Sequence, residues 1–337
     1  MNRKKCFFAI FALLATAALV FIAPLAEAAK YPSKPIKLIV ALGAGGSHDL
    51  NSRAIASVAH TYLGQPMYVQ LMPGGGGKVG MGAFMRAKPD GHTLVLASAS
   101  HLSVAPNVRN MGYDPLKDFI PVFHFTKQNY MMSTLVKKPW KNFDEFVAAA
   151  RANPGKVSYA SSGIYGVGHL QLLKLEADMK IKFNHIPFKG GGPGIRALLG
   201  GHVDSAGGNP TTGGSTDHVR AGTMRILAVA AKKRDPFFPD TPTFREKGVD
   251  FLLASKRFII ARTGTPQDRI NFLVESFKKL VKDKTYKRLL KKMNDKPNPI
   301  YGEALKKDVV DEYHAFGAIL RSIGAIKSNS GITVQRI

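Results

Sequence analysis

The chain has 337 residues, a formal net charge of +25 and a single cysteine. This length exceeds what one hydrophobic core usually holds, so we expect two lobes. The lone Cys6 excludes an intramolecular disulfide, and the strong positive charge favours anionic partners.

The N-terminus has the three parts of a secretory signal peptide. Basic residues at 3–5 precede an apolar run over 7–23, and the small-x-small pattern at 26–28 is a cleavage site. We expect residues 1–28 to be removed and the mature protein to reside in the periplasm. The loss of three basic residues and one acidic residue would lower the net charge from +25 to +23. The apolar run is short for a membrane span, so an uncleaved anchor is the weaker alternative.

A strand, a glycine-rich turn and a helix open the mature chain. Residues 36–42 are nearly all apolar and β-prone, which is typical of a strand buried on both faces of a parallel sheet. Apolar residues then recur at helical spacing until Gly64, with Ser47 and Asp49 as candidate N-caps. The alternation continues with a strand, a helix and a strand over 67–71, 79–87 and 93–97. Repeated βαβ units predict a doubly wound α/β lobe.

The same alternation restarts after residue 121. Asn142 and Glu145 resemble a capping box at the start of a helix. Further strands and helices are predicted over 157–160, 168–179, 185–187, 195–199, 203–206 and 225–230. Prolines between 236 and 242 mark an irregular stretch where the chain can return to the first lobe. We therefore assign residues 29–125 and 229–337 to lobe 1 and residues 126–228 to lobe 2, joined by a hinge.

The tail from Pro266 is predicted to be helical, with one apolar stripe surrounded by lysine and arginine. We interpret the basic residues as a solvated face. A docking surface for a partner or for an anionic membrane is the alternative. Nucleic acid is not expected, because the protein is exported and its aromatic residues are not interleaved with the basic runs.

Three glycine-rich turns follow predicted strands, at 43–47, 161–166 and 190–194. A glycine turn before a helix exposes backbone N–H groups at the positive end of the helix dipole, where a carboxylate or phosphate can accept hydrogen bonds. Two such turns facing each other across a cleft would clamp an anion. Taken singly, each turn is equally compatible with a loop that binds nothing.

Enzyme motifs are incomplete. The segment 74–78 resembles a phosphate loop, but Val79 stands where a hydroxyl is needed to bind magnesium. Gly43 and Gly45 lack the third glycine of a dinucleotide fingerprint. The consecutive residues 47–49 are of the types found in a catalytic triad, but neighbouring side chains on one turn point apart. The histidines have no metal-ligand spacing. We expect no catalytic residue, no metal and no cofactor.

Two polar residues near the glycine turns have two interpretations each. His169, at the start of a helix, either helps to hold an anion or is satisfied by local backbone, and the second outcome is the commoner one. Asp49 either caps its helix or contacts the ligand.

A series of motifs recurs in one order along the mature chain. They are 31–36, Gly45-Gly46-x-x-Asp49, 63–66, 73–77, 89–94, 159–163 with His169, 185–191, 198–204 and 238–243. Together they resemble the Bug-type periplasmic receptors of tripartite tricarboxylate transporters. The resemblance implies a type II periplasmic-binding-protein fold, with two doubly wound α/β lobes joined by a hinge and a ligand cleft between them.

The resemblance also implies a function. A monomeric receptor would capture a mono-, di- or aromatic carboxylate by cleft closure and deliver it to the integral-membrane permease subunits of a transporter. The ligand would lie between the loop after the first strand and the serine-glycine turn of the second lobe. The implied ligand-binding residues are Leu42, Gly43, Gly45, Gly46, Ser47, Asp49, Ser98, Ser161, Ser162, Gly163, Gly166, Val167, His169 and Asn209.

The chain departs from the family pattern at several positions. Ala41, Leu42 and Ala44 replace residues of the usual proline-rich first loop, which we expect to be looser. Gly208 precedes Asn209 where many members have an acidic residue, so an amino-acid ligand is less expected and a wider, aromatic ligand is a hypothesis. Two alternatives stay open: a carboxylate receptor that signals to a membrane sensor, and a secreted enzyme acting on a carboxylated substrate.

Overall fold

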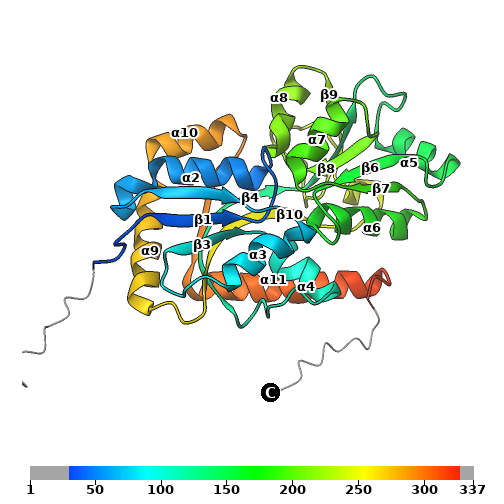
Figure 1. The fold of residues 1–337 in the computed structure, drawn as a ribbon. Helices are drawn as coiled ribbons and strands as arrows, with labels where there is room; N and C mark the ends of the chain where they lie inside the picture. Colours follow the sequence, from blue (N-terminus) through cyan, green and yellow to red (C-terminus); the bar gives the residue numbers. More distant parts are fainter. Residues whose placement is uncertain (1–29, 327–337) are drawn as a thin grey trace, which may run out of the picture. The chain divides into compact units, whose positions relative to one another are not determined.

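Two separate mixed β-sheets organise the chain in the computed structural model, which describes residues 30–326 (Figure 1). The first sheet has six strands in the order β11-β4-β10-β3-β1-β2, and the second has five in the order β7-β6-β8-β5-β9. The predicted signal peptide, residues 1–28, lies outside the described residues. From Lys34 to the last described residue, Ile326, the chain forms one unit by its internal contacts.

The first sheet combines parallel and antiparallel pairs. Its strands are β1 (Ile36–Val40), β2 (Met67–Leu71), β3 (Thr93–Ala97), β4 (Phe119–Asn129), β10 (Ala254–Arg262) and β11 (Pro297–Tyr301). β1 pairs in parallel with β2 and β3, whereas β10 runs antiparallel to β3 and β4. Its helices are α2 (Ser47–Leu63), α3 (Lys78–Met85), α4 (Ala105–Val108), α9 (Gln267–Leu280), α10 (Lys284–Lys292) and α11 (Gly302–Ser322).

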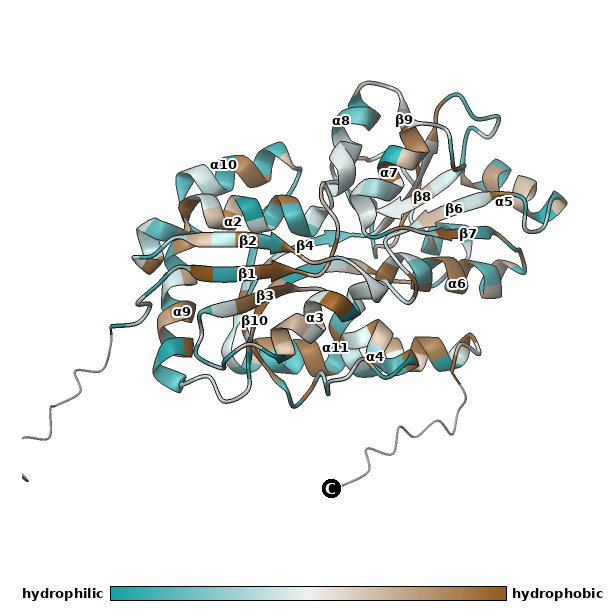
Figure 2. Cartoon of the chain, viewed as in Figure 1, coloured by the Kyte–Doolittle hydropathy of each residue, from teal (hydrophilic) through white to brown (hydrophobic). Residues whose placement is uncertain are grey.

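The core of the first sheet is built by strands that are apolar on both faces. Ile39, Val95 and Ile260 come from three adjacent strands, and each is at most 2% exposed. Figure 2 shows the hydrophobic residues concentrated in β1 and β3. Each such side chain contributes about 1.5–3 kcal/mol by burial. The prediction of a parallel strand at 36–42 is confirmed for Ile36–Val40, which is buried except at the partly exposed Lys37.

The second sheet repeats the α/β alternation. Its strands are β5 (Met131–Leu135), β6 (Ser158–Ser161), β7 (Asn184–Pro187), β8 (Ser205–Gly208) and β9 (Met224–Val229). Its helices are α5 (Phe143–Ala152), α6 (Val167–Met179), α7 (Gly191–Leu199) and α8 (Ser215–Arg220). The predicted capping box is confirmed in part. Asn142 accepts a hydrogen bond from the N–H of Glu145, but the Glu145 carboxylate accepts from the N–H of Lys141.

The chain passes between the sheets at several places. Tyr130 alone separates β4 of the first sheet from β5 of the second. The long helix α11 also spans both parts: Leu305 and Val309 pack in the cluster beneath the first sheet, and Phe316 and Leu320 pack in the cluster that contains the second-sheet side chains. The predicted lobe boundaries at 125/126 and 228/229 stay a prediction. Among residues 30–326, no helix combines the length and apolar character required to cross a bilayer.

Candidate functional site

Three helices from the two halves of the molecule begin at one place. α2 begins at Ser47 after the first sheet's β1, whereas α6 and α7 begin at Val167 and Gly191 after the second sheet's β6 and β7. These three residues line the same cavity. Each helix start presents backbone N–H groups and the positive end of its dipole, which favours an anion by about 0.3–1 kcal/mol per helix.

The cavity is small, and most of its lining residues carry a hydroxyl, amide or imidazole group. Its volume is about 30 Å³, and it is lined by Leu42, Gly46, Ser47, His48, Ser98, Ser100, Tyr130, Ser162, Val167, Gly191, Asn209, Thr212 and Ser255. Of these described lining residues, none is Asp, Glu, Lys or Arg. An anion here would therefore be held by backbone N–H groups and hydroxyls without repulsion from a carboxylate.

Hydrogen bonds between backbone atoms join the loops of the two sheets beside the cavity. The N–H of Gly43 donates to the carbonyl oxygen of Lys189 at 2.7 Å, and the N–H of Gly213 donates to that of Gly45 at 3.0 Å. Gly43 and Gly45 follow β1, whereas Lys189 and Gly213 follow β7 and β8. These bonds indicate that the structure has the closed arrangement of the two halves.

Side chains also bond across the cavity. The Asn209 Nδ2 donates to Ser47 Oγ at 3.0 Å, and the N–H of Val167 donates to Ser100 Oγ at 3.0 Å. Ser47 and Ser100 belong to elements after β1 and β3, whereas Val167 and Asn209 belong to elements after β6 and β8. A ligand oxygen that enters the cavity can replace these hydroxyls as the partner of the same donors.

Glycines allow the backbones to approach this closely. A Cβ on Gly43 would lie 2.4 Å from the Lys189 carbonyl oxygen, and a Cβ on Gly192 would lie 2.4 Å from that of Ala44. A Cβ on Gly190 would lie 2.6 Å from the Gly43 nitrogen. The first and third glycine-rich turns found in the sequence therefore contact each other directly, and a side chain at these positions would hold the two halves apart.

Two titratable side chains on the cavity wall are neutral at physiological pH. Burial, followed by the nearby Arg257 and His101, lowers the pKa of His48 to about 3. Burial raises the pKa of Tyr130 to about 12, so its hydroxyl stays protonated and can donate a hydrogen bond. The Arg257 guanidinium is fully buried and forms an ion pair with Asp295 at 2.9 Å. The side chains on the immediate wall of the cavity are thus uncharged, so any preference for an anion would have to come from backbone dipoles.

The structure brings half of the sequence-predicted ligand residues to the cavity wall. Those that line it are Leu42, Gly46, Ser47, Ser98, Ser162, Val167 and Asn209. The sequence also pointed to Gly43 and Gly45, which form the contact between the loops. Gly163 and Gly166 shape the turn before α6, where the N–H of Gly166 donates to the carbonyl oxygen of Gly163 at 3.2 Å.

Three polar residues among the predicted ligand contacts form hydrogen bonds within or beside the loops and do not line the cavity. The Asp49 carboxylate accepts from the N–H of Gly45 at 2.8 Å and from Arg53 Nε at 2.7 Å. His169 Nδ1 accepts from the N–H of Tyr165 at 3.1 Å, which is the local-backbone outcome for this histidine. Ser161 Oγ lies 2.7 Å from His185 Nε2. The prediction that Ser47 or Asp49 caps α2 is wrong, because Gly46 occupies the N-cap.

Sequence reasoning missed six residues of the cavity wall: His48, Ser100, Tyr130, Gly191, Thr212 and Ser255. Ser255 lies on β10, and Tyr130 lies between β4 and β5. Neither residue belongs to a turn motif, so no local sequence pattern marks them. Gly191 was recognised as part of a glycine-rich turn, and its position in that turn is the one signal that the sequence provides.

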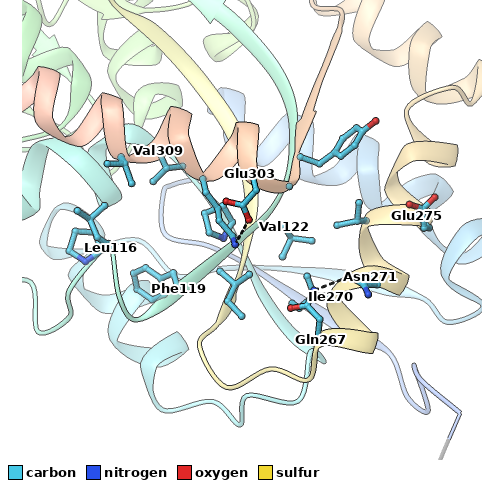
Figure 3. Close-up of a pocket in the computed structure, with 17 residues that line it drawn as sticks. Leu116, Phe119, Val122, Gln267, Ile270, Asn271, Glu275, Glu303 and Val309 are labelled. Atoms are coloured by element: carbon cyan, nitrogen blue, oxygen red, sulfur yellow. Dashed lines mark hydrogen bonds and ion pairs between the residues drawn. The ribbon is translucent and has the colours of Figure 1, made fainter.

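A larger hollow of about 500 Å³ lies between β4 and the beginnings of α9 and α11 (Figure 3). Its charged and amide side chains already have partners: Lys306 pairs with Glu303, Gln267 with Asn271, and Glu275 with Lys278. All of its lining elements belong to the first sheet. Because it contacts only one half, closure of the two halves cannot enclose a ligand there. Among residues 30–326, no group of His, Cys, Asp and Glu has the arrangement of a metal site.

Comparison with known proteins gives consistent matches. The family model described as tripartite tricarboxylate transporter family receptor matches residues 52–325. The protein BugT of Bordetella pertussis (strain Tohama I) is 31% identical over 333 residues, which cover 96% of this chain and 99% of BugT. The structure of the periplasmic binding protein BugD has a TM-score of 0.83 at 28% identity, covering 88% of this chain and 99% of BugD. The structure of MatC from Rhodopseudomonas palustris with bound malate has a TM-score of 0.80 at 25% identity, covering 86% of this chain and all of MatC.

Proposed function

This chain belongs to the tripartite tricarboxylate transporter family of receptors, and on that basis we propose that it is a periplasmic receptor that binds a small organic carboxylate. The observation that carries the proposal is the meeting of three helix N-termini, from both halves, at a cavity without acidic side chains. The malate bound to the similar MatC supports a carboxylate as the ligand class. Export through the signal peptide at 1–28 is part of the proposal.

Binding requires the two halves to move. A cavity of about 30 Å³ accommodates about one water molecule, so an organic acid cannot enter the closed arrangement. We propose that the loops after β6, β7 and β8 separate from the loops after β1 and β3, admit the ligand and close on it. The ligand carboxylate would then accept hydrogen bonds from the backbone N–H groups at the start of α2, α6 and α7. Three or four charge-assisted hydrogen bonds of about 1.5–3 kcal/mol each suffice for micromolar binding after association costs.

The closed receptor would then deliver its ligand to the permease subunits of a membrane transporter, the role that the family description names. A binding role also fits the side chains better than catalysis. The Asp49 carboxylate bonds with Gly45 and Arg53, so it does not orient His48 as a triad would require. His48 itself is neutral, and burial lowers its pKa to about 3.

The proposal can be tested on the full chain without knowledge of the ligand. Native mass spectrometry of protein purified without denaturation would reveal a co-purified acid. The stripped protein would then be screened by thermal shift against mono-, di- and aromatic carboxylates, because a ligand that binds only the folded state raises the melting temperature. A saturable shift with at least one carboxylate supports the receptor function. No co-purified acid together with no shift from any carboxylate would overturn it.

A further inference from the structure

A second cavity adjoins the first. It has a volume of about 220 Å³ and shares Leu42 and Ser162 with the smaller cavity. Loops from both sheets form its walls, namely the glycine run 74–77 after β2 and the segments 162–164 and 187–189. A ligand whose carboxylate reaches the three helix N-termini would therefore extend its other end into this second cavity.

Arg109 lines the second cavity and brings a positive charge to it. Its Nη2 donates to the carbonyl oxygen of Gly75 at 2.7 Å, and its guanidinium lies 5.7 Å from the centre of the Tyr165 ring. Its Nε is buried and has no hydrogen-bond partner. No carboxylate of the described residues lies within 4.0 Å of this guanidinium. The charge is thus held in place by a neutral carbonyl and an aromatic ring, and its bidentate donor set is not engaged by any acid.

The neighbouring glycine makes room for this guanidinium. A Cβ on Gly76 would lie 2.4 Å from Arg109 Nη2 and 2.9 Å from the Ile164 carbonyl oxygen. Gly76 also has a φ of +62°, a conformation that side-chain-bearing residues rarely adopt. The glycine run that resembles an incomplete phosphate loop therefore serves to seat Arg109 at the contact between the two halves.

The remaining walls are mostly apolar. Leu42, Ile164 and Phe188 belong to the lining of the second cavity, and the exposed Lys189 is the second basic residue there. A volume of about 220 Å³ corresponds to about seven water molecules at the density of the liquid, which leaves room for a spacer of several carbons. The two cavities together present an anion site, an apolar passage and a second cationic site.

We propose that Arg109 forms a second anion subsite and selects ligands with a second carboxylate at the far end of an apolar spacer. This inference rests on the proposed carboxylate-receptor function and specifies its ligand class. A guanidinium suits the role, because its planar donors bind a carboxylate with two parallel hydrogen bonds. Backbone dipoles would hold one end of the ligand, and an arginine would hold the other.

Isothermal titration calorimetry on the full chain can test the subsite. The probes are linear dicarboxylates of increasing length and the monomethyl ester of each, which keeps one carboxylate and the spacer. The wild type should bind the best diacid at least about tenfold more tightly than its monoester, a difference of about 1.4 kcal/mol. Arg109→Gln should abolish this preference, because the diacid loses more affinity than the monoester does. Arg109→Lys should retain only part of the preference for the diacid, because lysine keeps the positive charge but lacks the planar pair of N–H donors.

Arg151→Gln is the matched control. Arg151 lies on α5, its Nη2 also donates to a backbone carbonyl, that of Met179, and it lines neither cavity. This variant should keep the wild-type preference. Equal binding of diacid and monoester by the wild type, or an unchanged preference in Arg109→Gln, would overturn the inference while the carboxylate-receptor function stands. Failure of every linear diacid and every monoester to bind the wild type would overturn the inference, and the proposed function would fall with it only if the screen of mono-, di- and aromatic carboxylates also finds no ligand.

Discussion

The backbone nitrogen of Gly43 lies 2.7 Å from the carbonyl oxygen of Lys189, although the two residues follow strands of different sheets. A Cβ on Gly43 would lie 2.4 Å from that same oxygen, so the contact depends on a glycine. The closed arrangement is therefore specified by backbone contacts between glycine-rich turns. This explains why the turns have glycine at positions that do not line the cavity, such as Gly43 and Gly192.

Gly192→Ala should prevent full closure. Gly192 lies within α7 in a conformation open to any residue, so alanine costs nothing locally, but its Cβ would lie 2.4 Å from the Ala44 carbonyl oxygen in the other half. We expect ligand affinity to fall at least about tenfold, or 1.4 kcal/mol. Small-angle scattering should show that ligand no longer reduces the radius of gyration.

Gly82→Ala is the control for that variant. Gly82 lies in α3, where an added Cβ would make only an ordinary contact of 3.6 Å with Arg86. It should bind ligand like the wild type and be slightly more stable, because alanine favours helix over glycine by about 1 kcal/mol. Wild-type affinity in Gly192→Ala would contradict the role of the glycine contact.

Asp49→Ala should weaken ligand binding even though Asp49 does not line the cavity. Its carboxylate holds the N–H of Gly45 at 2.8 Å and so orders the loop that precedes α2. Loss of this charge-assisted hydrogen bond should cost about 1.5–3 kcal/mol of unfolding free energy and lower the ligand affinity severalfold. Urea denaturation and calorimetry measure the two effects.

Arg53→Ala removes the other partner of the Asp49 carboxylate. The Arg53 side chain is 58% exposed, so this ion pair contributes at most about 1 kcal/mol. If Arg53→Ala weakens ligand binding as much as Asp49→Ala does, the bond to Gly45 is not what orders the loop.

Local patterns predicted the first α/β units well. Strands at 67–71 and 93–97 agree with β2 and β3, and the helix that ends before Gly64 agrees with α2. In each case an apolar run of the right period is bounded by glycine or proline. Such segments can be recognised because local sequence and tertiary burial favour the same structure.

The sequence patterns do not predict the strands β4, β5 and β10, and β11 interrupts the tail from Pro266 that was predicted to be helical. β4 contains Thr126 and Gln128, and β10 contains Arg257; all three side chains are buried. Arg257 donates to Thr126 Oγ1 at 2.9 Å and to Gln128 Oε1 at 2.7 Å. Polar residues that satisfy each other across neighbouring strands interrupt the apolar pattern, and their pairing cannot be read from one segment alone.

The start of α7 was predicted too late for a related reason. The helix begins at Gly191, whereas the sequence predicted residues 195–199. Glycine and proline at 191–194 have low helix propensity, so local sequence predicts a loop. Contact with the backbone of the first turn requires glycine there, and tertiary packing overrides the propensity. The predicted glycine-rich turns follow strands and precede helices, and their role in ligand binding stays a prediction. The wall residues from distant strands, such as Ser255, could not be foreseen.

The Arg257 and Asp295 pair should show strong coupling. Both side chains are fully buried, and their ion pair measures 2.9 Å. Arg257→Met or Asp295→Leu alone leaves an unpaired buried charge and should cost about 3–5 kcal/mol of unfolding free energy. The double variant should lose much less than the sum of the two. Additive losses in a urea double-mutant cycle would show that the two charges are not coupled.

The free energy of unfolding should fall as the pH decreases from 6.5 towards 4, in part because His101 is protonated more readily in the unfolded chain. Burial lowers the pKa of His101 from 6.5 to about 4, so the unfolded chain binds more protons than the folded chain in this window. The contribution is complete above pH 6.5 and is lost as the pH falls through the folded pKa. His101→Gln should reduce the pH slope of the unfolding free energy between pH 6 and 5 by about 1 kcal/mol per unit. An unchanged slope in urea titrations would contradict the assignment of a buried neutral imidazole.

The most direct test of the carboxylate site compares one acid with its own primary amide. Calorimetry would use the carboxylate that gives the largest thermal shift, together with the amide of the same shape and no charge. Because backbone N–H groups and three helix dipoles surround the site, we predict that the acid binds at least about a hundredfold more tightly, a difference of about 2.8 kcal/mol. Equal affinities for the acid and the amide would contradict an anion site at the start of α2, α6 and α7.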